Sequence, residues 1–184
     1  AFAALVAARL GCDDAEAAGR IAAHDGAALA VLRRATILDP AVGSGAFLLG
    51  ALEQLSAAAP PGARRAAVRR RILARNLFGV DRNPMAVRLT ELRLWLAVVA
   101  DEAAGVDPAL APLPNLDCLV RQGDTLLEPF TVPSPARGAA EIGRLRKRAV
   151  VAWGAEKRAS VRELRRAEAA AAESALEAAA ERAE

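Results

Sequence analysis

Three short apolar runs, each followed closely by an aspartate, constrain the fold of this chain more than any other feature. The runs occupy residues 36–39, 77–81 and 118–121, and the acids are Asp39, Asp81 and Asp124. Loops and stretches with a helical spacing of apolar residues separate them. This alternation predicts an α/β fold with about three parallel strands and right-handed crossovers. Because ligands bind at the carboxyl ends of such strands, we expect the three carboxylates to line one crevice.

Helical patterns surround the three runs. Residues 2–34 predict two or three short helices, with Asp13 or Asp14 as a cap and an interruption at Asp25 and Gly26. After Asp81, Asn83 is a suitable N-cap for a helix whose apolar residues recur at spacings of four and three. We expect these residues to form one buried helix face: Met85, Leu89, Leu92, Leu96 and Val99.

The remaining segments are predicted to be loops and helices. A basic helix is expected over residues 63–75, and a loop is expected around Pro108, Pro112 and Pro114. Residues 129–135 are expected to be irregular. From about residue 137 to the end, the pattern predicts a long helix that is interrupted near Gly154.

Charge and composition allow a nucleic-acid partner without demonstrating one. The net charge is +3 and the isoelectric point is near 9.5, with basic residues gathered in residues 64–75 and 144–166. Aromatic residues that would stack on bases are not interleaved with these basic residues. A solvated or intramolecular role for the basic helices is therefore the favoured interpretation, with contact to DNA phosphates as the alternative.

Cysteine and histidine content excludes several classes of site. Cys12 and Cys118 match no metal or redox spacing, so we expect reduced thiols and a cytoplasmic protein. His24 is the single histidine, and its expected role is structural, so no metal site is implied. No apolar run approaches the length of a membrane span, and no secretory signal is expected. Because the sequence lacks an initiator methionine, we expect that it begins inside a longer polypeptide.

The loop after the first run is the most informative segment. Gly43 and Gly45 lack side chains, so a ligand can approach the backbone closely. The dinucleotide pattern Gly-x-Gly-x-x-Gly fails because its sixth position is Leu48, and no lysine supports a phosphate-binding P-loop. An acid followed by such a loop suits a cationic ligand without phosphates, of which S-adenosylmethionine is an example. A glycine-rich turn that binds nothing is the alternative.

The two later acids each have a functional and a structural interpretation. Asp81 can accept hydrogen bonds from both hydroxyls of a ribose, or it can be an ordinary helix-capping acid. Asp124 can accept from an adenine amino group while the backbone N–H of Thr125 meets a ring nitrogen. The alternative for Asp124 is a simple turn residue after Gly123.

Taken together, these blocks resemble the N6-adenine DNA methyltransferases of large type IIG restriction–modification and phage-defence systems. Residues 39–48 resemble motif I in its DPAxGSGxFL form. Residues 76–96, NLFGVDRNPMAVRLTELRLWL, resemble motif II, and residues 113–127, LPNLDCLVRQGDTLL, resemble motif III. The resemblance covers roughly residues 30–128. It implies a Rossmann-like class I methyltransferase sheet that binds S-adenosylmethionine.

The resemblance also implies a set of cofactor-binding residues. Those around the methionine moiety would be Asp39, Pro40, Ala41, Gly43, Ser44 and Gly45, and Ser44 and Phe47 would shape the loop and pack beneath it. Asp81 would hold the ribose, and Arg82, Asn83 and Met85 would lie near the adenosine. Asp124 and Thr125 would recognise the edge of the adenine, whereas Trp95 is expected in the core.

What the sequence lacks sets the limits of the implied function. The Asn-Pro-Pro-Tyr motif that holds a flipped adenine in this family does not occur, so the chain is expected to be inactive alone, with duplex DNA as the partner of its full-length parent. The implied division is a helical lead-in over 1–34, a cofactor-binding part over 35–130 and a helical extension over 131–184. A missing fourth strand would leave the first strand open. The alternatives are an RNA or protein-amide methyltransferase and a non-catalytic module.

Overall fold

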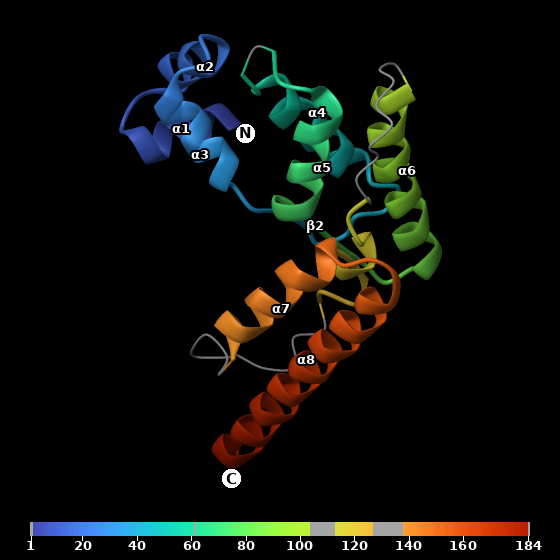
Figure 1. Cartoon of the computed structure of the whole chain (residues 1–184). Helices are drawn as coiled ribbons and strands as arrows, with labels where there is room; N and C mark the ends of the chain where they lie inside the picture. Colours follow the sequence, from blue (N-terminus) through green and yellow to red (C-terminus); the bar gives the residue numbers. More distant parts are fainter. Residues whose placement is uncertain (1, 61, 104–112, 127–137, 184) are drawn as a thin grey trace.

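The computed structural model describes residues 2–60, 62–103, 113–126 and 138–183 of the chain (Figure 1). The loops expected around Pro108 and Pro112 and over residues 129–135 lie outside these described residues. The helices are α1 (Phe2–Leu10), α2 (Asp14–Ala22), α3 (Gly26–Arg34), α4 (Ala46–Ala57), α5 (Arg65–Arg75), α6 (Pro84–Ala103), the 3-10 helix η1 (Leu116–Cys118), α7 (Ala139–Val151) and α8 (Gly154–Ala183). None of the helices described is long and apolar enough to cross a membrane.

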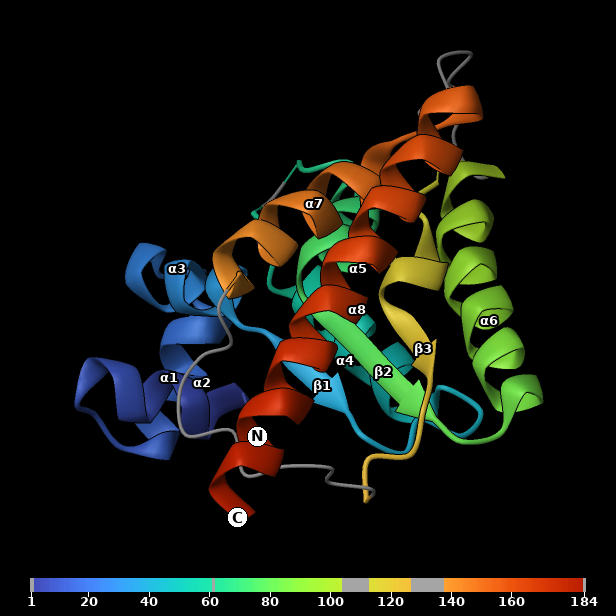
Figure 2. The same cartoon turned by 90° about the horizontal axis from the view of Figure 1, so that it is seen from below.

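Three parallel strands form the central sheet, as the sequence predicts. They are β1 (Ile37–Asp39), β2 (Leu77–Asp81) and β3 (Val120–Gln122), in the order β1-β2-β3. Ile37 pairs with Leu77, and Gly79 pairs with Val120. The third strand begins two residues later than predicted, because Cys118 belongs to η1. Helices α4, α5 and α6 lie on one side of the sheet, and α7 and α8 lie on the other (Figures 1 and 2).

The N-terminal segment forms three separate helices because acids cap two of them. Asp13 accepts a hydrogen bond from the backbone N of Glu16 at 2.7 Å, which fixes the start of α2. Asp25 accepts from the backbone N of Ala28 at 3.0 Å at the start of α3. Such caps stabilise a helix end by about 1 kcal/mol each. The predicted two or three short helices are confirmed as three.

The hydrophobic core lies between the sheet and helices α4 to α6. Leucines from α4, α5, β2 and α6 are at most 2 % exposed: Leu48, Leu52, Leu73, Leu77 and Leu94. Gly79 in β2 has no side chain, and a Cβ atom there would lie 3.0 Å from Val42 Cγ2 and 3.2 Å from Leu48 Cδ1. The loop after β1 therefore packs directly on β2. On the other side of the sheet Leu38 in the edge strand β1 is 57 % exposed.

The predicted buried face of α6 is wrong. All five residues assigned to it are exposed: Met85 by 71 %, Leu89 by 45 %, Leu92 by 50 %, Leu96 by 55 % and Val99 by 42 %. The buried face instead contains Val87, Thr90, Glu91, Leu94 and Val98. Both faces carry apolar residues, so the spacing alone does not identify the face that packs on the sheet. Trp95, expected in the core, is 38 % exposed.

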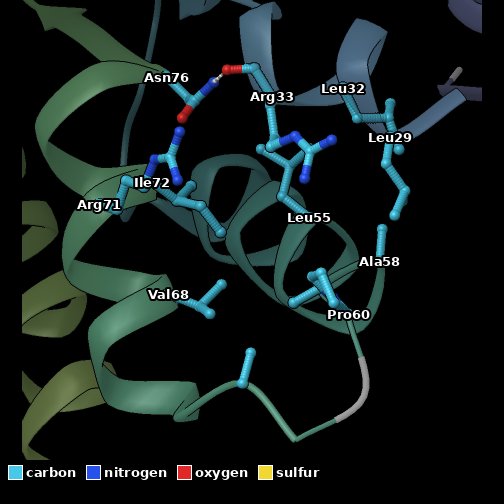
Figure 3. A pocket seen from close by; sticks show the side chains of 12 residues that line it. Leu29, Leu32, Arg33, Leu55, Ala58, Pro60, Val68, Arg71, Ile72 and Asn76 are labelled. Atoms are coloured by element: carbon cyan, nitrogen blue, oxygen red, sulfur yellow. Dashed lines mark hydrogen bonds between the residues drawn. The ribbon is translucent and has the colours of Figure 1, made fainter. Parts of the chain in front are cut away.

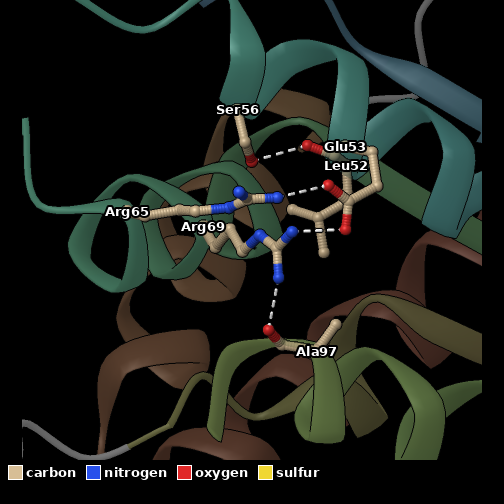
Figure 4. A network of polar contacts seen from close by, with 6 residues as sticks. All are labelled: Leu52, Glu53, Ser56, Arg65, Arg69 and Ala97. Carbon is tan, nitrogen blue, oxygen red and sulfur yellow. Dashed lines mark hydrogen bonds and ion pairs between the residues drawn. The ribbon is translucent and has the colours of Figure 1, made fainter. Parts of the chain in front are cut away.

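A polar network around Arg69 joins three helices (Figure 4). Arg69 is 4 % exposed, contacts Glu53 of α4 in an ion pair and donates to the carbonyl of Ala97 in α6 at 2.5 Å. Arg65 also contacts Glu53, at 2.7 Å. These contacts confirm the intramolecular interpretation for this part of the basic helix α5.

Helices α7 and α8 form a hairpin that is fixed to the sheet from one side. The chain reverses between Val151 and Gly154, the first residue of α8, whose φ is +58°, in agreement with the predicted interruption. Arg121 of β3 and Arg146 of α7 both contact Glu168 of α8, at 2.8 and 3.0 Å. Leu164 in α8 is fully buried. The predicted long helix is therefore two packed helices.

Candidate functional site

The three aspartates predicted to converge lie at one edge of the sheet. Asp39 and Asp81 end the neighbouring parallel strands β1 and β2, and Asp124 follows β3 by two residues. The loop after β3 contacts the loop after β1, since the hydroxyl of Thr125 donates to the carbonyl of Pro40 at 2.9 Å. Arg82 lies 3.9 Å from a carboxylate oxygen of Asp124. The loops after all three strands are thus linked.

Asp81 holds the first loop against the second strand. One of its oxygens accepts from the backbone N of Asn83 and the other from the backbone N of Gly43, both at 2.8 Å. The hydrogen bond from Asn83 and, to a smaller extent, that from Gly43 lower the pKa of Asp81 below its usual value. The side chain is therefore an anion at neutral pH. A carboxylate has about four lone-pair sites, so it retains capacity for further hydrogen bonds.

The lowered pKa of Asp81 predicts a pH dependence of stability. A carboxyl group with a lower pKa in the folded state stabilises the fold above its unfolded value of about 4, and this contribution is lost as the pH falls through the folded value. Asp81→Asn should therefore lower the melting temperature at about pH 7 but have a smaller effect near pH 3. Thermal unfolding of both proteins across this range measures the gap. A gap that does not narrow in acid would contradict the prediction.

The two glycines of the first loop have different neighbours. Gly43 has a φ of +52° and Gly45 a φ of +77°, a region that favours glycine. A Cβ atom on Gly45 would lie 2.8 Å from Thr90 Oγ1 and 2.9 Å from Thr90 Cγ2. Gly45 is therefore required for packing against α6. Beside Gly43, by contrast, the carbonyl oxygen of Ala41 is, among the described residues, the one heavy atom within 4 Å of an added Cβ, at 3.9 Å.

Two residues of α6 that are not among the predicted site residues support this loop. Thr90 donates to the carbonyl of Gly43 at 3.1 Å, and Arg93 donates to the carbonyl of Ser44 at 2.7 Å. Both are polar residues within a mostly apolar helix, and that contrast is the signal that could have found them. Asp39 accepts from the backbone N of Ala41 at 3.1 Å, which turns the chain directly after β1.

Apolar residues assigned to the site are exposed. Phe47 is 59 % exposed and Ser44 is also exposed, so the expectation that these two residues pack beneath the loop is wrong. Met85 is 71 % exposed, and its backbone N donates to the side chain of Asn83 at 2.9 Å, which confirms Asn83 as the N-cap of α6. Exposed apolar side chains at an edge lined with carboxylates suit a ligand with both apolar and polar parts.

The third loop is held by its own side chains. Asp124 accepts from the backbone N of Leu126 at 3.0 Å, and Gln122 donates to the carbonyl of Arg82 at 3.3 Å. Gly123 bonds through its backbone N to the carbonyl of Asp81 at 3.0 Å. Asp124 thus lies beside the loop that follows Asp81. It also makes an Asx turn, as expected if it is a turn residue after Gly123.

Two of the cavities that the described residues line lie away from this edge. One, of about 270 Å³, lies between α3, α4 and α5. Leu29, Leu55 and Ile72 are part of its apolar lining, and Arg33 and Arg71 also line it (Figure 3). The other, of about 360 Å³, is lined by residues of α1, α2 and α4 together with Leu32 and His24. The carboxyl edge is therefore distinguished by its carboxylates and its glycine loop, and not by the size of a cavity.

The described residues contain no cluster of metal-binding side chains. Within residues 2–60, 62–103, 113–126 and 138–183, no group of three or more histidine, cysteine or acidic side chains is placed to hold a metal ion. Cys12 and Cys118 are free, and burial raises the pKa of the Cys118 thiol to about 11. Cys118 is therefore a protonated core residue at neutral pH.

A parallel α/β sheet with acids and a glycine loop at its carboxyl edge is an arrangement that occurs in nucleotide-binding folds. Comparison with known families is more specific: the family model described as N-6 DNA methylase matches residues 27–129. The chain belongs to this family. The matched region contains β1, β2 and β3 and all three aspartates.

A relative and the solved structures complete the comparison. The chain is 35 % identical over 114 residues to a putative type II restriction enzyme and methyltransferase of Methanocaldococcus jannaschii. That match covers 52 % of this chain and 9 % of the relative. The chain thus spans about a tenth of the relative's length. No solved structure gives a significant match.

Proposed function

We propose that the carboxyl edge of the sheet binds S-adenosylmethionine, and that the chain is the cofactor-binding part of a DNA adenine-N6 methyltransferase. A restriction–modification or phage-defence system is the proposed setting. Membership of the N-6 DNA methylase family and the similarity to a restriction enzyme and methyltransferase support this function. The observation that carries it is the convergence of Asp39, Asp81 and Asp124 at one edge.

The residues at the edge fit this cofactor. Space beside Gly43, two exposed apolar side chains and three carboxylates suit a nucleoside that is joined to a sulfonium and an amino acid. In the proposed complex, Asp39 and residues 40–45 surround the methionine moiety and Asp81 accepts from the ribose. Asp124 and Thr125 contact the adenine edge, with Arg82, Asn83 and Met85 beside them. The cofactor supplies a methyl group carried on a positive sulfur.

The proposal assigns binding, and not methyl transfer, to this chain. Its sequence contains no Asn-Pro-Pro-Tyr motif and no tyrosine at all, so it offers neither the amide and carbonyl that hold a flipped adenine nor that motif's aromatic ring. Residues 35–130 form the proposed cofactor-binding part, and residues 131–184 form the proposed helical extension.

Calorimetric titration of S-adenosylmethionine tests the binding proposal. We expect wild type to bind and Asp81→Ala to bind at least tenfold more weakly, because the variant loses an anionic acceptor and the bond that holds Gly43. Asp14→Ala is the matched control, since Asp14 is an exposed acid in α2, away from the sheet edge. Equal affinity of wild type and Asp81→Ala would remove the ribose assignment. No binding to wild type would overturn the proposal for this chain.

A further inference from the structure

The outward face of α8 carries a row of four arginines. Arg158, Arg162, Arg165 and Arg166 are all exposed. The inward face of the same helix segment contains Ser160 and Leu164, which are 2 % and 0 % exposed. Because a helix turns 3.6 residues per turn, the four arginines lie on the side opposite to these buried residues.

These arginines differ from the other arginines of the hairpin in their contacts. Arg146 contacts Glu168, Arg148 contacts Glu163 and Arg144 contacts Glu141. Among the residues that the structure describes, no ion pair or hydrogen bond partners the four arginines of the outward face. The intramolecular interpretation of the basic stretch 144–166 therefore holds for its inner residues and fails for this row.

The spacing of the row costs helix stability. Arg158 and Arg162 are four residues apart, as are Arg162 and Arg166, and Arg162 and Arg165 are three apart. Like charges at these spacings are neighbours on the helix surface and destabilise it. A row of guanidinium groups that repel one another, and that no described acid neutralises, is suited to an external anion.

We propose that the outward face of α8 binds the phosphate backbone of duplex DNA. The row extends over about 12 Å at the rise of an α-helix, a length along which a DNA duplex presents about seven phosphate charges. Guanidinium groups match phosphates by bidentate hydrogen bonding. The row contains no residue of the carboxyl edge, so this contact adds to the proposed function without depending on cofactor binding.

Two features of α8 favour duplex DNA over other anionic partners. No aromatic side chain lies among the four arginines, so the row itself offers no surface on which unpaired bases can stack, and the exposed Trp153 precedes the helix. Alanines flank the four arginines, and the exposed large apolar residue of α8, Leu176, lies ten residues beyond Arg166. The row itself therefore lacks the several large apolar residues with which a helix inserts into a membrane surface. A regular phosphate backbone requires neither feature.

Salt-dependent binding of a labelled duplex, measured by fluorescence anisotropy, tests the proposal. Each phosphate contact contributes about −0.9 to the slope of log affinity against log salt. Replacing all four arginines with glutamine should therefore make the slope shallower by about 3 to 4. Between about 50 and 200 mM salt, wild type should lose about 100-fold more affinity than the variant loses. The same four positions changed to lysine should retain most of the slope.

A matched control removes the same charge elsewhere. Arg9, Arg34, Arg71 and Arg75 are exposed arginines of α1, α3 and α5, and their replacement by glutamine should change the slope by less than half as much. An equal change in both variants would overturn the proposal, as would a wild-type slope in the α8 variant. Tighter binding of single-stranded DNA or of anionic vesicles than of the duplex would also overturn it.

Two further readouts separate this proposal from a structural role and from the cofactor proposal. The α8 glutamine variant should melt at the same temperature as wild type or higher, because its like charges are removed. A large fall in the melting temperature of the glutamine variant would indicate a structural role for the arginines. The salt slope of the lysine variant would then test the DNA proposal. S-adenosylmethionine binding should be unchanged in the α8 variant, and Asp81→Ala should retain the wild-type salt slope.

Discussion

Gly45→Ala should destabilise the fold by about 2–5 kcal/mol. Its φ of +77° costs an L-residue about 1–2 kcal/mol, and the added methyl group would lie 2.8 Å from the Thr90 hydroxyl in a well-packed region, which adds about 1–3 kcal/mol. Thr90 is fully buried and donates to the carbonyl of Gly43, so it cannot move without loss of that hydrogen bond. Urea unfolding of both proteins measures the difference.

Two comparisons separate the causes of this loss. Gly50→Ala is a matched control in the middle of α4, where a Cβ atom would meet no described residue within 4 Å, and it should stabilise the protein by up to about 1 kcal/mol. Gly45→Ala combined with Thr90→Ala should be less destabilised than the sum of the single changes, by about 1–2 kcal/mol. A Gly45→Ala protein as stable as wild type would show that the loop does not pack on α6 as described.

Local sequence signals were sufficient to predict the sheet and the place of its acids. Each apolar run is short and ends at or just before an aspartate, and parallel strands place such ends together whatever the exact register. The starts of strands depend on longer-range contacts. The sequence predicts that Cys118 belongs to a strand, but Asn115, which is 6 % exposed, holds the preceding segment to α7, and η1 forms before β3 begins.

The spacing of apolar residues does not identify which face of α6 is buried. Its apolar stripe beginning at Met85 has ideal helical spacing, yet the side that packs inward includes Thr90 and Glu91. Thr90 fits there because Gly45 leaves room for it and the carbonyl of Gly43 accepts its hydroxyl proton. A polar residue is favourable at a buried position when a specific partner satisfies it, and that partner is distant in sequence. The loop and the helix face are therefore determined together.

Asn115 is the residue whose replacement should reveal how strongly the hairpin depends on the sheet. Its side-chain amide donates to the carbonyls of Ala149 at 2.6 Å and of Ala152 at 2.7 Å, at the end of α7. Carbonyls at the end of a helix lack partners within the helix, and these two belong to buried residues, 0 % and 6 % exposed. Asn115→Leu keeps the approximate shape but leaves both without a donor, so we expect a loss of about 2–5 kcal/mol in urea unfolding.

The control for Asn115 is an amide that makes one exposed hydrogen bond. Gln122 donates to the carbonyl of Arg82 at 3.3 Å, and Gln122→Leu should change stability by no more than about 0.5 kcal/mol. Asn115→Asp, which retains the shape but turns donors into acceptors facing two carbonyls, should be at least as damaging as leucine. If both Asn115 variants were as stable as wild type, then the α7–α8 hairpin would not be fixed through this amide. The orientation of the arginine row on α8 relative to the sheet would then require another anchor, such as Glu168 with Arg121 and Arg146.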